Sequence, residues 1–340
     1  MAISPTVLQD AIIMVGNDKS FKDYEGRIDN YGAFKVFTEG ADTLLPKSTV
    51  ETIKKSYVQP EKIPVLNQIN TTMYSTYTCN ISPDGSTSAF VPVTYITTGF
   101  DVGITPAVNA GNYISAVEDL AWQLKQGFKN VYASVLEADA VAFLETNKSL
   151  TNLSPTSLFP GSNFTAGVFT VPDSQKATFY SKIPTIFQRN VIPGKPLDLA
   201  NTEAAPNYEY IANQGTGNGQ NLAYQVQGVD RVYRSNFVPT ANDGSIQETH
   251  FLLPVGGVGV YNWLPWEAQN EIVIIPGSQG WKKQTDPIAG MQWQVYYNYN
   301  CSGGQFAQSW SYRASFAFMK QYSSDANKSS ILKYQIAAAV

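Results

Sequence analysis

The longest regular hydrophobic pattern of the chain covers residues 115–148. Its apolar side chains recur in steps of three and four residues, which keeps one stripe of a helix against a core. A Ser115-x-x-Glu118 capping box indicates where the helix begins. A helix of about thirty residues would span on the order of 45 Å, far beyond the usual length in globular domains. The predicted core stripe comprises Ile114, Val117, Ala121, Leu124, Phe128, Val131, Val135, Ala138 and Ala142.

Ahead of this helix, the pattern changes to the alternation typical of strands. β-Branched and aromatic residues alternate with polar ones over residues 62–82 and 87–100, on either side of the turn Pro83-Asp84-Gly85-Ser86. A Pro-Asp-Gly sequence favours a tight turn. These residues therefore predict a long β-hairpin.

The remaining patterns mix helices and strands. Residues 1–46 predict an extended arm with short helical pieces, and residues 48–57 and 174–190 predict helices, the second broken or kinked by Pro184. Strands are predicted at 196–199, 208–212, 223–227, 231–237 and 250–255, and long alternating strands at 271–277, 291–303 and 308–323. This order of elements predicts an α+β fold.

Composition leaves the surface open to two interpretations. The 340 residues are 43% hydrophobic and 13% aromatic but only 15% charged. A surface low in charge and rich in aromatics is typical of large protein interfaces, but a sheet-rich monomer with neutral polar faces also fits. The formal net charge of −4 gives no cationic field, which argues against nucleic-acid binding as the main activity. No signal peptide or membrane span is evident, so we expect a soluble protein made in a cytoplasm.

The sequence contains no convincing catalytic, cofactor or metal site, and we expect no enzymatic activity. His250 is the only histidine, and it is predicted to lie at the start of a strand. Cys79 and Cys301 are too few and too far apart to begin a zinc site. The glycine-rich run at 215–219 lacks the Lys-Ser/Thr ending of a phosphate loop. The acids Glu118, Asp119, Glu137 and Asp139 are expected on the polar side of the long helix.

Taken in order, these elements resemble the major capsid proteins of tailed bacteriophages, which have the Hong Kong 97 fold. The resemblance covers an arm, a hairpin, a long helix, an α+β region and returning strands. Two weak motifs accompany it: Leu136, Glu137, Ala140 and Leu144 in the helix, and Gly228, Val232, Ser235 and Pro239 in a later strand.

The resemblance implies a division of the chain into arm, extended loop, and peripheral and axial domains. The arm would be residues 1–46, the extended loop 74–106 and the axial domain 178–288. The peripheral domain would comprise residues 47–73, 107–177 with the long spine helix, and 289–340. An extended hairpin in such a shell lies across a neighbouring subunit.

The resemblance also implies two sets of assembly residues. The extended loop would contribute Asp84, Gly85, Phe90, Val91 and Tyr95. The polar face of the spine helix would contribute Glu118, Lys125, Lys129 and Glu137.

The function implied is self-assembly into an icosahedral shell of pentamers and hexamers around a double-stranded DNA genome, with the DNA contacted non-specifically. No lysine occurs between Lys62 and Lys125, so an isopeptide cross-link from the loop is not expected. Strength would come from buried area or a separate cement protein. The short arm cannot contain a scaffolding domain, which implies a separate scaffold protein beside a portal. The expected location is the virion capsid, assembled in the host cytoplasm.

Two other functions stay open. An encapsulin-like compartment would use the same fold to package enzymes. A β-rich glycan-binding or tail-spike module would use exposed Trp and Tyr side chains, although the long helix argues against it.

Overall fold

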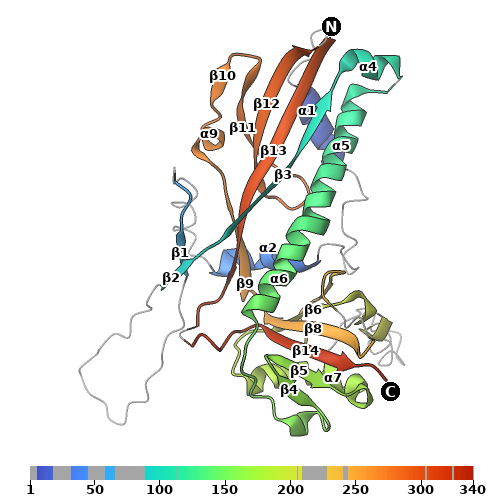
Figure 1. Ribbon diagram of the computed structural model, residues 1–340, viewed down its shortest axis with the longest axis vertical. Helices are drawn as coiled ribbons and strands as arrows, with labels where there is room; N and C mark the ends of the chain where they lie inside the picture. Colours follow the sequence, from blue (N-terminus) through green and yellow to red (C-terminus); the bar gives the residue numbers. More distant parts are fainter. Residues whose placement is uncertain are drawn as a thin grey trace, which may run out of the picture.

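The computed structural model describes residues 6–17, 32–44, 58–65, 89–112, 114–204, 206–208, 228–239, 244–302, 305–323 and 325–339. Figure 1 shows an elongated molecule with one long-stranded sheet, a second sheet at its lower end and a long helix running beside the first sheet. The predicted α+β fold class is confirmed.

The first sheet is antiparallel and is organised around its longest strand, β13. One side of β13 pairs with β3, and the other side pairs first with β12 and then with β9. Trp310, Tyr312 and Phe316 alternate along β13 and are buried, as the period-two pattern predicted. In order across the sheet, the strands are β10 (Val273–Ile275), β11 (Gln279–Thr285), β12 (Gln292–Ser302), β13 (Gln305–Lys320) and β3 (Tyr95–Ile104), with β9 (Val258–Trp263) beside β13.

The predicted spine helix is confirmed, as three consecutive segments with one turn of π-helix in the middle. They are α5 (Ala116–Asn130), η1 (Val131–Leu136) and α6 (Glu137–Asn147). The helix packs closely on the sheet, since a Cβ added at Gly127 would lie 2.3 Å from the ring of Phe100 on β3. A side chain at that position would push the helix away from the sheet.

The predicted capping box is wrong, although the helix does begin after Ser115. The Ser115 side chain makes no capping hydrogen bond. Asp119 holds the first turn instead, because its carboxylate accepts hydrogen bonds from Asn109 Nδ2 (2.8 Å) and Gln123 Nε2 (3.1 Å). Asn109 lies on α4 (Pro106–Gly111), so the preceding helix fixes this start.

The predicted core stripe holds in the first half of the spine helix and fails in the second. Leu124, Phe128 and Val131 are buried, but Val135 is 43% exposed. A π-turn bonds residue i to i+5 and takes up one residue more than an α-turn. The stripe is thereby displaced, and the buried positions after the π-turn include Leu136, Glu137, Ala140 and Leu144. Three other residues of the predicted stripe are not buried. Ala142 is exposed, Ala138 is half-buried, and Ile114 lies before the start of the helix and is half exposed.

The second sheet is mixed, with α7 (Lys176–Arg189) packed against it. Phe179, Tyr180 and Ile183 of α7 contribute to a separate core. The sequence predicted a break or a kink at Pro184. The structure has no break there, and the helix continues to Arg189. From edge to edge, the strands are β4 (Asn163–Thr165), β5 (Val168–Val171), β14 (Leu332–Ala337), β8 (Ile246–Pro254), β6 (Pro196–Ala200) and β7 (Val232–Arg234).

The strands of the two sheets come from both sides of residues 178 and 288, the expected bounds of the axial domain, and the domain division itself stays a prediction. Strands β9, β10 and β11 fall within 178–288 but pair into the first sheet. The C-terminal strand β14 joins the second sheet between β8 and β5, and β5 pairs in turn with β4; the sequence pattern predicted neither β4 nor β5. Local alternation reveals strands but not their distant partners, so these assignments lie beyond what the sequence pattern can resolve.

Several shorter elements complete the fold. The arm contributes helices α1 (Thr6–Asn17) and α2 (Gly32–Leu44), in agreement with the expected helical pieces. Strands β1 (Lys62–Val65) and β2 (Ala89–Pro92) form a two-stranded antiparallel sheet, and the hairpin beyond them lies outside the described residues. The predicted helix at 48–57 and strands at 208–212 and 223–227 also fall mainly or wholly outside them. Short helical turns are η2 (Thr156–Leu158), η3 (Asp173–Gln175), η4 (Thr202–Ala204) and α9 (Trp266–Gln269). Within the described part of the chain, no helix has the length and apolar character needed to cross a membrane.

Candidate functional site

Glu137 does not lie on the polar face of the spine helix, where it was expected. It is completely buried, and its carboxylate accepts hydrogen bonds from the backbone amides of Ala33 (2.9 Å) and Phe34 (2.8 Å). These amides belong to the first turn of α2, where backbone N–H groups have no partner within the helix and the helix dipole favours negative charge. Glu137 therefore fixes the arm helix to the spine.

The arm helix α2 also contacts the second sheet. Glu39 of α2 accepts hydrogen bonds from Arg231 Nη1 (3.0 Å) and from the Tyr233 hydroxyl on β7 (2.5 Å). At the start of α2, a Cβ added at Gly32 would lie 2.3 Å from the carbonyl oxygen of Arg234. Only glycine allows this close approach, so α2 is held between the spine helix and β7.

The outer face of α5 keeps the other three residues expected there, together with one that was missed. Glu118 and Lys129 are exposed and Lys125 is partly buried. Trp122 lies between them at helical spacing and is 61% exposed. The face is therefore not purely polar.

A second apolar surface lies at the edge of the first sheet. The side chains of Val273, Ile274 and Ile275 on β10 are 53%, 52% and 50% exposed, and Trp266 on α9 is 40% exposed. β10 is the outermost strand and pairs only with β11 within the described residues. A consecutive apolar run on an edge strand is a surface that natural proteins usually cover.

The residues predicted for the extended loop divide between the described and undescribed parts of the chain. Asp84 and Gly85 lie outside the described residues. The backbone of Phe90 pairs with Pro64 at the base of the hairpin. Val91 and Tyr95 are partly buried and pack against the small core of Leu44, Ile63, Tyr261, Ala317 and Met319. Their assembly role stays a prediction.

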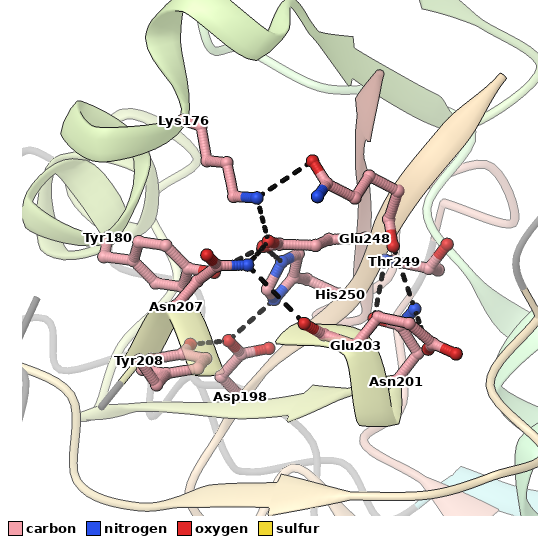
Figure 2. Close-up of polar contacts among 11 residues, drawn as sticks. Lys176, Tyr180, Asp198, Asn201, Glu203, Asn207, Tyr208, Glu248, Thr249 and His250 are labelled. Carbon is pink, nitrogen blue, oxygen red and sulfur yellow. Dashed lines mark hydrogen bonds and ion pairs between the residues drawn. The ribbon is translucent and has the colours of Figure 1, made fainter. Parts of the chain in front are cut away.

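The second sheet contains a buried polar cluster that the sequence reading missed. Figure 2 shows the His250 ring between two carboxylates. His250 Nδ1 lies 2.9 Å from Asp198 Oδ2 and Nε2 lies 3.2 Å from Glu248 Oε2, and all three side chains are completely buried. His250 and Glu248 are neighbours on one face of β8, and Asp198 lies on the adjacent strand β6.

Side chains from α7 and from residues 206–208 complete the cluster. The Tyr180 hydroxyl and Asn207 Nδ2 donate hydrogen bonds to Glu248, and the Tyr208 hydroxyl donates to Asp198. Lys176 Nζ lies 2.8 Å from Glu248 Oε1. The carboxylates therefore face two cationic groups and three neutral donors, and the cluster joins α7 to both strands (Figure 2).

The two carboxylates set the charge of His250. Burial by itself disfavours the imidazolium, but the charges and hydrogen bonds of Asp198 and Glu248 outweigh it and raise the pKa of His250 to about 9. Burial likewise opposes ionisation of Glu248, yet hydrogen bonds from His250, Lys176 and Tyr180 lower its pKa below the usual value. For Asp198, burial prevails and raises the pKa. At neutral pH the imidazolium is therefore the central cation of the cluster.

This arrangement predicts a stability that falls at alkaline pH. Because the folded pKa of His250 lies above its unfolded value of about 6.5, its contribution is complete below pH 6.5 and is lost as the pH rises through about 9. The loss is on the order of 3 kcal/mol. Chemical denaturation between pH 6 and 10 would measure it. A His250→Asn variant, which cannot titrate, should show a much smaller decline, and an equal decline would contradict this assignment.

Within the described residues, no group of three or more His, Cys, Asp or Glu side chains could hold a metal ion. The Asp198–His250–Glu248 arrangement contains a histidine between acids that bond to it inside the protein, and Asp198 Oδ1 is buried without a hydrogen-bond partner. Its chemistry is that of a structural ionic network.

Comparisons with known proteins found no matching family model and no matching curated protein. Among solved structures, the chain is similar to one from Mycobacterium phage Cain, at 10% identity over 95% of this chain and 94% of that chain, with a TM-score of 0.44. It is also similar to the cyanophage A-1(L) capsid asymmetric unit, at 13% identity over 87% and 94%, with a TM-score of 0.44. A third is the holo-SrpI encapsulin complex from Synechococcus elongatus, at 15% identity over 86% and 88%, with a TM-score of 0.40.

Proposed function

We propose that this chain is the major capsid subunit of a tailed bacteriophage. Copies of it would assemble into an icosahedral shell of pentamers and hexamers that encloses a double-stranded DNA genome. The sequence resemblance suggested this role, and the arrangement of uncovered surfaces around a rigid centre supports it. No catalytic step is part of the proposal.

The observation that carries the proposal is the base of the hairpin. β1 and β2 form a two-stranded sheet separate from the two larger sheets. Their chain continues into β3, an edge strand of the first sheet. Ile63 of β1 and Val91 of β2 pack on the small core with Leu44 and Tyr261, so the base of the hairpin is anchored to its own subunit. A two-stranded ribbon that leaves such a base is only marginally stable by itself in water, and a neighbouring subunit would cover it.

The rigid centre fits the same role. Glu137 connects the spine helix to the arm helix α2, and Glu39 connects α2 to the second sheet at β7. The same helix packs against β9 of the first sheet. Such connections keep the outer contact surfaces in fixed relative positions. A subunit of a closed shell needs this, because each contact must set the angle to the next copy.

The partners proposed are further copies of this chain, a separate scaffold protein and a portal, with strength supplied by buried area or by a cement protein. DNA would be contacted non-specifically. The proposed location is the virion capsid, after assembly in the host cytoplasm.

Shortening the hairpin tests the proposal. Deleting Asp84 and Gly85 with their flanking turn should leave the subunit folded, since the deletion lies beyond the β1–β2 pair. Assembly should fall at least tenfold, because the loop could no longer reach across the neighbour. Gradient sedimentation would separate large particles from free subunits, and circular dichroism would check folding. Normal particles from the folded variant would contradict the assembly role of the loop.

The contents of purified particles would decide between a capsid and an encapsulin-like compartment. Nuclease-protected double-stranded DNA in particles from infected cells would support the capsid. A co-purifying enzyme without DNA would support the compartment.

A further inference from the structure

His250 can hold both of its acids only while its ring is protonated. Nδ1 lies 2.9 Å from Asp198 and Nε2 lies 3.2 Å from Glu248, with all three side chains completely buried. An imidazolium donates from both nitrogens, whereas a neutral imidazole has one N–H and one lone pair. Loss of the proton therefore turns a lone pair toward one carboxylate where water cannot compensate, whichever tautomer forms.

The two acids differ in how far they depend on the ring. Glu248 has three further partners, which are Lys176, Tyr180 and Asn207. Among the described residues, Asp198 has one further donor, the Tyr208 hydroxyl, which bonds the same oxygen as the ring. The other oxygen, Oδ1, is buried without a partner. Asp198 is therefore the acid with less to replace the ring, and Tyr208 is bonded directly to it.

The charges of the cluster balance while the proton is in place. The cluster contains two acids and two cations, which are Asp198, Glu248, His250 and Lys176. Burial holds the pKa of Tyr180 on α7 and of Tyr334 on β14 above the usual tyrosine value, so both stay neutral as His250 titrates. Among the described residues, the other titratable or charged groups on the elements packed around the ring are Tyr208, Arg234 on β7 and Glu203 on η4. Removing the proton from His250 therefore leaves a buried net negative charge.

Residues 206–208 have the weakest attachment in this arrangement. β6 and β8 are inner strands of the second sheet with a partner on both sides, and α7 is held by five buried side chains. Of residues 206–208, Tyr208 is buried, Asn207 is partly buried and Pro206 is exposed. Asn207 bonds Glu248 and Tyr208 bonds Asp198, as Figure 2 shows. Both bonds end on the carboxylates that His250 holds.

We propose that Asp198, His250 and Glu248 form a proton-operated latch, which holds residues 206–208 on the second sheet and releases them when His250 loses its proton. With the ring protonated, both carboxylates are bonded and Tyr208 covers them. With the ring neutral, departure of Asn207 and Tyr208 admits water to the uncompensated carboxylates, which lowers the cost of their charge. The latch operates within one subunit and does not depend on assembly into a shell.

The pH range of the release follows from the two states of the ring. Burial alone would lower the pKa of His250, but the two carboxylates raise it to about 9 while the latch is closed, against about 6.5 for a solvated ring. The equilibrium between closed and open forms should therefore be constant below pH 6.5. Above this pH it should shift toward the open form by up to about tenfold per pH unit, and it should level off above about pH 9.

Limited proteolysis of the full-length chain tests the latch. Subtilisin digestion between pH 6 and 10 would be followed by mass spectrometry, with each rate divided by the rate for an unfolded peptide at the same pH. Cleavage at residues 206–208 should accelerate by about tenfold or more between pH 6 and 9, while the spine helix stays protected. A constant rate at residues 206–208, or an equal acceleration in the spine helix, would overturn the proposal.

Substitutions make the result specific to the latch. His250→Asn cannot titrate, so its cleavage at residues 206–208 should not vary with pH. Tyr208→Phe keeps the aromatic ring but removes the bond to Asp198, and it should raise cleavage at pH 6 several-fold. Tyr296→Phe, in the first sheet, is the matched control and should have no effect. A folded His250→Asn variant with the full pH dependence, or equal effects of the two Tyr→Phe changes, would contradict the latch.

The charge of the ring can also be measured directly. Because His250 is the only histidine, the ring ¹⁵N signals of histidine-labelled, unassembled chain belong to this residue alone. Both nitrogens should be protonated at pH 7, and the ring should become neutral near pH 9. A ring that is already neutral at pH 7 would overturn the proposal.

Discussion

Replacing Glu137 with Ala is expected to lower the free energy of unfolding by about 3 kcal/mol. The carboxylate accepts two hydrogen bonds from buried backbone amides at the start of α2, and Ala33 and Phe34 are completely buried. Without Glu137, both amides lose their acceptor in a place where water cannot readily replace it. Denaturant unfolding followed by circular dichroism would measure the change.

Two matched variants make this result specific. Glu118→Ala removes an acid from the same helix at an exposed position, and its effect should stay within about 0.5 kcal/mol. Glu137→Gln retains one carbonyl acceptor and should lose about half as much stability as Glu137→Ala. Equal small effects of Glu137→Ala and Glu118→Ala would show that Glu137 does not hold the arm helix.

Replacing His250 with Leu is expected to cost on the order of 3–5 kcal/mol. The substitution leaves Asp198 and Glu248 buried on adjacent strands without the imidazolium between them. Lys176 still faces Glu248, so the uncompensated charge falls mainly on Asp198. Thermal and denaturant unfolding near pH 7 would measure the loss.

A double-mutant cycle separates this charge effect from a change in packing. Adding Asp198→Leu to His250→Leu removes both partners, and exchanging a buried pair for apolar groups costs less than breaking it. The double variant should therefore be more stable than the sum of the two single changes predicts. Strict additivity would show that the two side chains are not coupled.

The parts of the fold that depend on local pattern could be predicted from the sequence. The apolar stripe at Leu124, Phe128 and Val131 identified the spine helix, and alternation identified the long strand β13. The helical pieces of the arm were also foreseen. The pairing of the strands could not be predicted in this way. β14 and β8 pair although they are far apart in the sequence, and alternation within a strand does not indicate its partner.

The errors at individual residues have definite physical causes. Glu137 looked like a surface acid because a regular α-helix would place it there, and the π-turn moved it into the core. His250 looked like the start of a strand, whereas β8 begins at Ile246 and carries the histidine inward beside Glu248. The spacing Glu248-x-His250 did signal a shared strand face, but Asp198 reaches it only through the pairing of β6 with β8.

The list of candidate assembly residues on the spine helix was incomplete. Sequence spacing brought Glu118, Lys125 and Lys129 to one face of the helix, where the structure also has them. Trp122 fits the same spacing and is 61% exposed, but it was not among the predicted residues. A large apolar residue within an otherwise charged helical stripe was the available signal.

Negative-stain electron microscopy of the purified full-length chain, with light scattering on the same sample, tests the central claim most directly. The account predicts closed shells, or rings of five and six subunits, formed by the chain itself or after addition of its scaffold. A stable, monodisperse monomer under both conditions would contradict it and would favour a glycan-binding module.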